Sequence, residues 1–232
     1  MRYRAVFFDA GETLVHPSPS FPELFARIVE REGHHVLPDD VVLASRAVTE
    51  RFRQASRANE RWTTSPERSR VFWLSVYELM LGELELPAAD GLRETLYDAF
   101  TDRSNYGLFD DVRPALDRLA AEGRTVGLVS NFEAWLDDLL ADLGVRDAFA
   151  VRVISGIEGV EKPDPVIFRL ALDRAGMTAN EVAYVGDNPE FDVDPPAALG
   201  MYPVLIDRRD RYPDHRGARI THLDQLAGML DG

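Results

Sequence analysis

Short apolar runs alternate with amphipathic segments along the chain from about residue 105 onward. The runs that we interpret as strands are 125–129, 150–154, 182–185 and 204–206. Apolar residues at helical spacing, with glycine after several of the segments, predict helices at 112–120, 136–143, 164–176, 196–199 and 223–230. Asp164 followed by Pro165 is a typical helix start. This alternation predicts a parallel sheet with helices on both faces.

The segment from residue 17 to residue 104 breaks the alternation. It carries four predicted helices, at 21–32, 40–57, 67–81 and 89–101, with no convincing strand between them. Ala5–Phe8 supplies one more apolar strand before it. We therefore expect an α/β fold with a Rossmann-like, three-layer α/β/α core built from residues 1–16 and 105–232. Residues 17–104 are expected to form an inserted α-helical cap domain.

Charge and composition narrow the classes of partner. The chain has 26 Lys and Arg against 40 Asp and Glu, a formal charge of −14, which disfavours nucleic acid as a partner. It has no cysteine, which excludes disulfides and thiolate metal sites. The apolar run before Asp9 is too short for a signal peptide, and no segment approaches the roughly 20 apolar residues of a membrane span. We expect a cytoplasmic protein with no membrane partner, as a monomer or homodimer.

Polar residues follow several of the predicted strands. They are Asp9 to Thr13, Ser130 with Asn131, Glu161 with Lys162, and Asp187 with Asp192 five residues later. Ligands of doubly wound sheets bind at the carboxyl ends of the strands, so these residues are expected to converge. Lys162 is also the only lysine in the chain, every other basic side chain being arginine. A compact ammonium group fits a cramped position beside carboxylates better than a planar guanidinium does.

This ordered set resembles the four motifs of the haloacid dehalogenase superfamily. Asp9 to Thr13 is similar to the first motif, Ser130 to the second, Lys162 to the third, and Asp187 with Asp192 to the fourth. The stretch from Glu161 to Phe168 is typical of the subgroup whose helical cap is inserted after the first motif. The helical segment 17–104 lies at that place in the sequence.

The resemblance implies a magnesium-dependent phosphatase acting on a small phosphorylated metabolite. Asp9 would be the nucleophile that forms an aspartyl-phosphate, and Lys162 would neutralise charge beside it. Mg²⁺ would be held by Asp9, the Gly11 carbonyl, Asp187 and Asp192. The phosphoryl oxygens would be bound by Thr13, Ser130 and the backbone amide of Asn131.

Gly11 departs from the family pattern, because phosphatases of this family usually have a second Asp at that position to transfer protons. General acid–base assistance is typically worth about 10²–10⁴ in rate, so turnover on ordinary phosphomonoesters is expected to be weak. Glu12 and His16 lie close by in sequence and are the alternative proton donors.

Other branches of the family also lack the second Asp. Members that cleave phosphonates use a cap lysine, and the cap segment of this chain has none. A 2-haloacid dehalogenase remains an alternative, although such enzymes need no metal and typically have Ser and Asn in place of the acidic fourth motif. A catalytically weak or non-catalytic binding module is the third hypothesis. Outside the motifs, Trp62 is a candidate for lining a substrate pocket, and Arg208, Arg209 and Arg211 are interpreted as a solvated basic loop.

Overall fold

The computed structural model describes residues 2–58, 60–87 and 91–230. The chain divides into two compact units, one formed by Met1–Val15 with Leu108–Gly232 and the other by His16–Gly107. The segment interpreted from sequence as a cap, residues 17–104, lies within the second unit. Its function as a cap stays a prediction.

The first unit is built on a six-stranded sheet in which every neighbouring pair of strands is parallel. In spatial order the strands are β5 (Val151–Ile154), β4 (Thr125–Ser130), β1 (Ala5–Phe8), β6 (Val182–Gly186), β7 (Tyr202–Ile206) and β8 (Arg219–Ile220). The five strands predicted from apolar runs are all present. The sequence did not indicate β8, because two residues are too short for a recognisable pattern.

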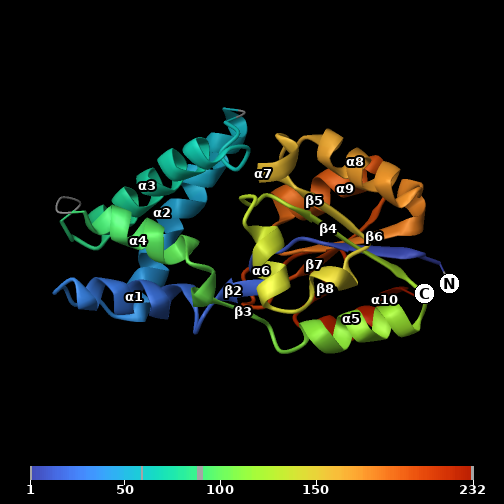
Figure 1. The fold of residues 1–232 in the computed structure, drawn as a ribbon, viewed down its shortest axis with the longest axis horizontal. Coiled ribbons are helices and arrows are strands. Elements are labelled where there is room, and N and C mark those ends of the chain that lie inside the picture. The colour runs from blue at the N-terminus through green and yellow to red at the C-terminus, as the bar shows by residue number, and fades with distance from the viewer. Residues whose placement is uncertain (1, 59, 88–90, 231–232) are drawn as a thin grey trace. The chain divides into compact units, whose positions relative to one another are not determined.

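Helices cover both faces of this sheet, which confirms the predicted α/β class. The helices α8 (Pro165–Ala175) and α9 (Asp194–Leu199) lie on one face, and α5 (Val112–Ala121) and α10 (Ala227–Leu230) lie on the other (Figure 1). Asp164 caps α8, since its carboxylate accepts a hydrogen bond from the Val166 amide at 3.0 Å. The remaining helical segments are α6 (Leu136–Asp142), α7 (Ser155–Glu158), the 3₁₀ turns η2 (Arg146–Ala148), η3 (Ala179–Glu181) and η5 (Leu223–Leu226), and a π-helical turn, η4 (Pro189–Val193).

The central strand β1 is buried on both of its faces, as its uninterrupted apolar sequence requires. Phe7 packs with Val129, Phe168 and Tyr184 in the core beneath α8. Gly127 of β4 makes room for this packing, because a Cβ atom there would lie 2.4 Å from the Phe7 ring. This close packing holds β1 in place at the centre of the sheet, and so holds the backbone of Asp9, which follows it.

The second unit contains four helices: α1 (Phe21–Arg31), α2 (Pro38–Arg57), α3 (Pro66–Glu83) and α4 (Leu92–Thr101). Ser20 and Ser65 cap α1 and α3 through their hydroxyl groups. Residues 89 and 90, where the fourth helix was predicted to begin, lie outside the described residues. A 3₁₀ turn, η1 (Arg103–Asn105), follows α4, and β2 (Val15–Pro17) pairs with β3 (Tyr106–Leu108) in a separate two-stranded sheet.

Trp62 packs inside the helical unit, and its role in lining a substrate pocket stays a prediction. Its side chain is only 4% exposed, and its ring stacks on Phe72 with the centroids 5.0 Å apart. Phe52 packs edge-on against the same pair of rings, at 5.6 Å from Trp62 and 5.2 Å from Phe72. Burial of a large aromatic surface in the core of the helical unit therefore determines the position of Trp62.

Candidate active site

Three neighbouring strands bring the predicted nucleophile next to its partners. Asp9 follows β1 directly, Ser130 is the last residue of β4, and Asp187 follows β6. Because β1 pairs in parallel with both β4 and β6, and Phe8 lies opposite Leu128 and Val185, these residues occupy adjacent positions at one sheet edge. The hydroxyl of Ser130 donates a hydrogen bond to Asp9 Oδ1 at 3.0 Å.

The only lysine of the chain lies between two of the predicted acidic residues. Lys162 Nζ is 2.7 Å from Asp9 Oδ1 and 2.6 Å from Asp192 Oδ1. The side chains of Lys162 and Asp192 are 3% and 2% exposed, so this ion-paired group is shielded from water. Burial alone would lower the lysine pKa, but the charges of Asp192 and Asp9 outweigh it and raise the pKa of Lys162. Lys162 therefore stays protonated.

Asn131 fixes the backbone of Lys162. Its side-chain amide donates to the Lys162 carbonyl at 2.8 Å, and its Oδ1 accepts from the Lys162 amide at 2.6 Å. This double hydrogen bond joins the loop after β4 to the loop that carries the lysine. The sequence pointed only to the backbone amide of Asn131, and its binding of a phosphoryl group stays a prediction.

The two acidic residues of the fourth motif come together because the chain turns back on itself after β6. Asn188 caps the π-helical turn η4, its side chain accepting from the Glu190 amide at 3.0 Å. The backbone amide of Asn188 in turn donates to Asp192 Oδ2 at 3.0 Å. Gly186 allows this close return, since a Cβ atom at that position would lie 2.4 Å from Asp192 Cγ.

Asp9, Asp187 and Asp192 each offer a carboxylate oxygen within 4.8 Å of the others. Burial, followed by the charge of Asp192, raises the pKa of Asp187. Burial also raises the pKa of Asp192, against the opposing effect of Lys162. A buried group of carboxylates that resists ionisation is a fitting donor set for a hard divalent cation, because the cation would supply the missing positive charge.

Tyr184 is a member of the site that the sequence did not indicate. Its ring is fully buried in the core, while its hydroxyl donates to the Val129 carbonyl at 2.8 Å. The same hydroxyl lies 3.2 Å from Asp192 Oδ1 and 3.3 Å from Lys162 Nζ. In the sequence it is one more apolar residue of a buried strand, and nothing there indicates that its hydroxyl reaches the ion pair.

Thr13 is fully buried in the turn that follows Asp9. Its amide donates to the Ala10 carbonyl at 3.3 Å, and its own carbonyl accepts from Arg208 Nη2 at 2.8 Å. Its hydroxyl has no hydrogen-bond partner among the described residues. A buried hydroxyl without a partner, four residues after Asp9, is compatible with the predicted phosphoryl contact, which stays a prediction.

Gly11 leaves space where the family usually has an acidic side chain. A Cβ atom there would have the Phe132 ring as its nearest neighbour, at an ordinary contact distance of 3.8 Å. Of the two alternative proton donors, Glu12 pairs with Arg209 at 2.7 Å, and His16 Nδ1 lies 2.7 Å from the Pro17 carbonyl oxygen. Glu12 is therefore occupied as an ion-pair partner.

The interpretation of Arg208, Arg209 and Arg211 as a solvated basic loop is wrong for Arg208, whereas Arg209 and Arg211 are solvent-exposed but also form ion pairs. Arg208 is 10% exposed and forms a two-pronged ion pair with Asp111, at 2.8 and 2.9 Å. Arg209 binds Glu12 of the first motif, as above, and Arg211 Nη2 binds Asp187 Oδ2 at 2.6 Å. Each arginine of this loop therefore contacts an acidic partner in or near the site, because the loop after β7 runs beside the turn after β1.

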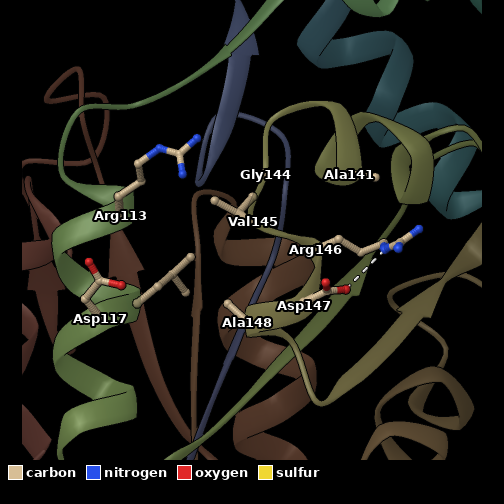
Figure 2. Close-up of a pocket in the computed structure, with 9 residues that line it drawn as sticks. Arg113, Asp117, Ala141, Gly144, Val145, Arg146, Asp147 and Ala148 are labelled. Atoms are coloured by element: carbon tan, nitrogen blue, oxygen red, sulfur yellow. Dashed lines mark hydrogen bonds and ion pairs between the residues drawn. The ribbon is translucent and has the colours of Figure 1, made fainter.

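The first unit has two further places where charged groups gather. A hollow of about 270 Å³ lies between α5 and residues 141–148 (Figure 2). Three of its charged groups have local partners, with Arg113 donating to the Leu143 carbonyl and Arg146 pairing with Asp147 at 3.4 Å.

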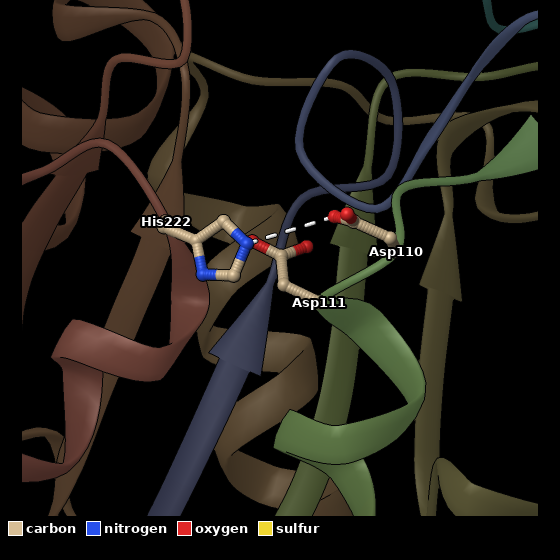
Figure 3. Close-up of side chains that lie close together, drawn as sticks. All are labelled: Asp110, Asp111 and His222. Carbon is tan, nitrogen blue, oxygen red and sulfur yellow. Dashed lines mark ion pairs between the residues drawn. The ribbon is translucent and has the colours of Figure 1, made fainter.

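The second place is a group of two aspartates and a histidine (Figure 3). His222 Nε2 lies 3.6 Å from both Asp110 and Asp111. The Asp111 carboxylate already accepts from Arg208 and from the Leu223 amide, at 2.8 Å each. Asp111 thus holds Arg208 and the backbone at Leu223, and these contacts account for its burial beside His222.

The fold and the strand-end site define the class, and sequence comparison agrees. A family model described as haloacid dehalogenase-like hydrolase matches residues 3–200. The chain belongs to this family of hydrolases. It is 30% identical to haloacid dehalogenase-like hydrolase domain-containing protein 3 of Danio rerio, over 98% of this chain and 96% of that protein.

Relatives named for an activity fall in two groups. A phosphoserine phosphatase of Thermus thermophilus is 34% identical over 64% of this chain and 58% of its own length. The (S)-2-haloacid dehalogenase 4A of Burkholderia cepacia is 26% identical over 79% of this chain and 80% of its own length. The magnesium-bound structure of YfnB from Bacillus subtilis shares the fold over the full length of both chains, with a TM-score of 0.79 and 18% identity.

Among the described residues, none of the helices has the length and apolar character needed to cross a membrane. The cytoplasmic location and the oligomeric state, monomer or homodimer, stay predictions.

Proposed function

We propose that this hydrolase is a magnesium-dependent phosphatase that acts on a small phosphorylated metabolite through an aspartyl-phosphate at Asp9. The observation that carries the proposal is the buried ion-paired group in which Lys162 contacts both Asp9 and Asp192. The proposed nucleophile, the Asp9 carboxylate, would then act beside a fixed cation, in a setting where electrostatic interactions are stronger than in water. The phosphatase among the named relatives and the magnesium bound to YfnB also support it.

The first step is attack by an Asp9 carboxylate oxygen on phosphorus. Lys162 and Ser130 both donate to Oδ1, so we assign the attack to Oδ2. An Asp9–phosphorus bond forms as the bond to the leaving oxygen breaks. Water then attacks phosphorus, the bond to Asp9 breaks, and inorganic phosphate leaves with the carboxylate restored.

The donor set fits Mg²⁺, which prefers oxygen ligands and usually keeps several of its waters. We assign the carboxylates of Asp9, Asp187 and Asp192 and the carbonyl of Gly11 as its ligands, the first three on the strength of their clustered oxygens. When bound, the ion would neutralise charge on the phosphoryl group. The hydroxyls of Thr13 and Ser130 and the backbone amide of Asn131 would bind phosphoryl oxygens.

Proton transfer to the leaving group is the weak point of this site. Gly11 has no side chain, and the nearest group to the empty position is the apolar ring of Phe132. Since a poor leaving group needs a proton as it departs, we expect the enzyme to favour substrates whose leaving group is stable as an anion, or whose own groups supply the proton.

A 2-haloacid dehalogenase is the second candidate, favoured by the absence of an acidic side chain at Gly11 and by the dehalogenase among the relatives. In that reaction Asp9 would displace halide from carbon. The carboxylates of Asp187 and Asp192 are less suited to it, because they would repel an anionic haloacid unless a cation lay between them.

A panel of phosphate esters, assayed with and without Mg²⁺, tests the proposal. Phosphate release should require Mg²⁺ and be lost in Asp9→Asn, while the exposed-residue control Asp173→Asn should keep it. Halide release from a 2-haloacid without metal, also lost in Asp9→Asn, would establish the dehalogenase instead. A protein that binds substrate analogues but turns over neither class would be the non-catalytic module.

A further inference from the structure

Arg211 forms an ion pair with one of the assigned metal ligands. Its Nη2 lies 2.6 Å from Asp187 Oδ2, with the two side chains 44% and 16% exposed. An arginine guanidinium keeps its charge throughout the physiological pH range, so Arg211 is a permanent cation. The contact therefore places a fixed positive charge on a carboxylate that Mg²⁺ also needs.

The backbone that carries Arg211 is firmly held. Asp207 is fully buried, and its two carboxylate oxygens accept from the amides of Arg211 and Tyr212, each at 2.8 Å. Arg219 binds the same carboxylate at 2.8 Å. These bonds fix the backbone of Arg211, and so the point from which its side chain reaches Asp187.

The charges of the site indicate exchange of cations. Asp9, Asp187 and Asp192 together carry three negative charges when ionised, and Lys162 and Arg211 oppose them with two positive charges. Adding a divalent ion while Arg211 remains would leave an excess positive charge, whereas replacing Arg211 by that ion gives exact balance. The carboxylate oxygen that Arg211 occupies would also be released to the metal.

We propose that Arg211 is an internal competitor for the metal site, and that Mg²⁺ must displace it from Asp187 to bind. This inference rests on the proposed metal site and deepens it. The consequence is a site that loads at a higher Mg²⁺ concentration than the three carboxylates alone would set.

Calorimetric titration with Mg²⁺ alone, without substrate, tests the competition. Removing the competitor in Arg211→Gln should tighten Mg²⁺ binding by about two- to fivefold, the range set by a partly exposed ion pair. Arg211→Lys keeps the charge but loses the planar fork, and should tighten binding less. The matched control is Arg209→Gln, which removes the same charge from the same loop but frees Glu12, and should stay within about twofold of the wild type.

Unchanged or weaker Mg²⁺ binding in Arg211→Gln overturns the inference, since the arginine would then be indifferent to the metal or would orient Asp187 for it. If the wild type binds Mg²⁺ and Asp187→Asn does not, the proposed metal site is supported whatever the result for Arg211. If neither the wild type nor Arg211→Gln binds Mg²⁺, both the metal site and the competition are overturned. Metal-free thermal melts of each variant test whether it folds. If Arg211→Gln does not fold, Arg211→Lys tests the competition in its place.

Discussion

Gly186→Ala is the sharpest test of how the fold positions Asp192. A Cβ atom on residue 186 would lie 2.4 Å from Asp192 Cγ and 2.5 Å from its Cβ. Non-bonded carbon atoms settle at about 3.5–4.0 Å, so Asp192 would have to withdraw by roughly 1 Å. The contact from Lys162 Nζ to Asp192 is only 2.6 Å, and a shift of that size would break it.

The magnitude follows from two effects. Overpacking a tight interior with a methyl group typically costs about 1–3 kcal/mol of stability. Displacing a reacting or ligating group by about 1 Å can lower activity on the order of 10²-fold. We therefore expect Gly186→Ala to fold with reduced stability, to bind Mg²⁺ more weakly, and to lose most of its turnover.

Denaturant unfolding measures the loss of stability, calorimetric titration measures the Mg²⁺ affinity, and phosphate release measures the turnover. Gly11→Ala is the matched control, because its added methyl group meets only the Phe132 ring, at 3.8 Å. It should unfold within about 0.5 kcal/mol of the wild type, as substitutions without a steric conflict usually do. Wild-type stability and wild-type Mg²⁺ affinity in Gly186→Ala would refute the packing account of this strand end.

Two further predictions concern acidic side chains of the site, the one that Gly11 lacks and the one of Asp187. Gly11→Asp should raise kcat on esters with poor leaving groups by up to about 10²-fold, with little change on good ones, and equal rates on both would mean that another group already supplies the proton. The pKa of Asp187 is raised by folding, so its contribution to metal-free stability is full below the unfolded pKa of about 4 and is lost as pH rises through the folded value. Asp187→Asn does not titrate, and metal-free melts should therefore show it gaining stability relative to the wild type between pH 5 and pH 8; a constant difference contradicts the shift.

The sheet was predictable because each strand was an apolar run bounded by turn residues. Asp9 and Lys162 were predictable for different reasons, Asp9 from its place after a buried strand and Lys162 from being the only lysine. Their convergence followed from parallel pairing, which brings strand ends to one edge. Local sequence was therefore enough for the residues whose position depends on a single strand and the loop after it.

The residues that were missed depend on contacts between segments far apart in the chain. Arg208 and Arg211 belong to a loop whose charges ordinarily point to solvent, and only the path of the chain after β7 brings them to Asp111 and Asp187. Tyr184 has the pattern of a buried strand residue, and its hydroxyl is revealed as part of the site by a partner 8 residues away, Asp192. Hydrophobic periodicity carries no information about such polar pairings.

The electrostatics of the site bear on whether it is catalytic. A fold that needed only rigidity would gain nothing from burying Asp187 and Asp192, since burial raises the pKa of both and so opposes their ionisation. Lys162 offsets this for Asp9 and Asp192, and Arg211 offsets it for Asp187 from a half-exposed position. Well-packed apolar residues would have stabilised the same strand ends with no need of compensation. The proposed cation would supply the charge that compensates these carboxylates, which favours the metal-dependent hydrolase over a module that keeps only the fold.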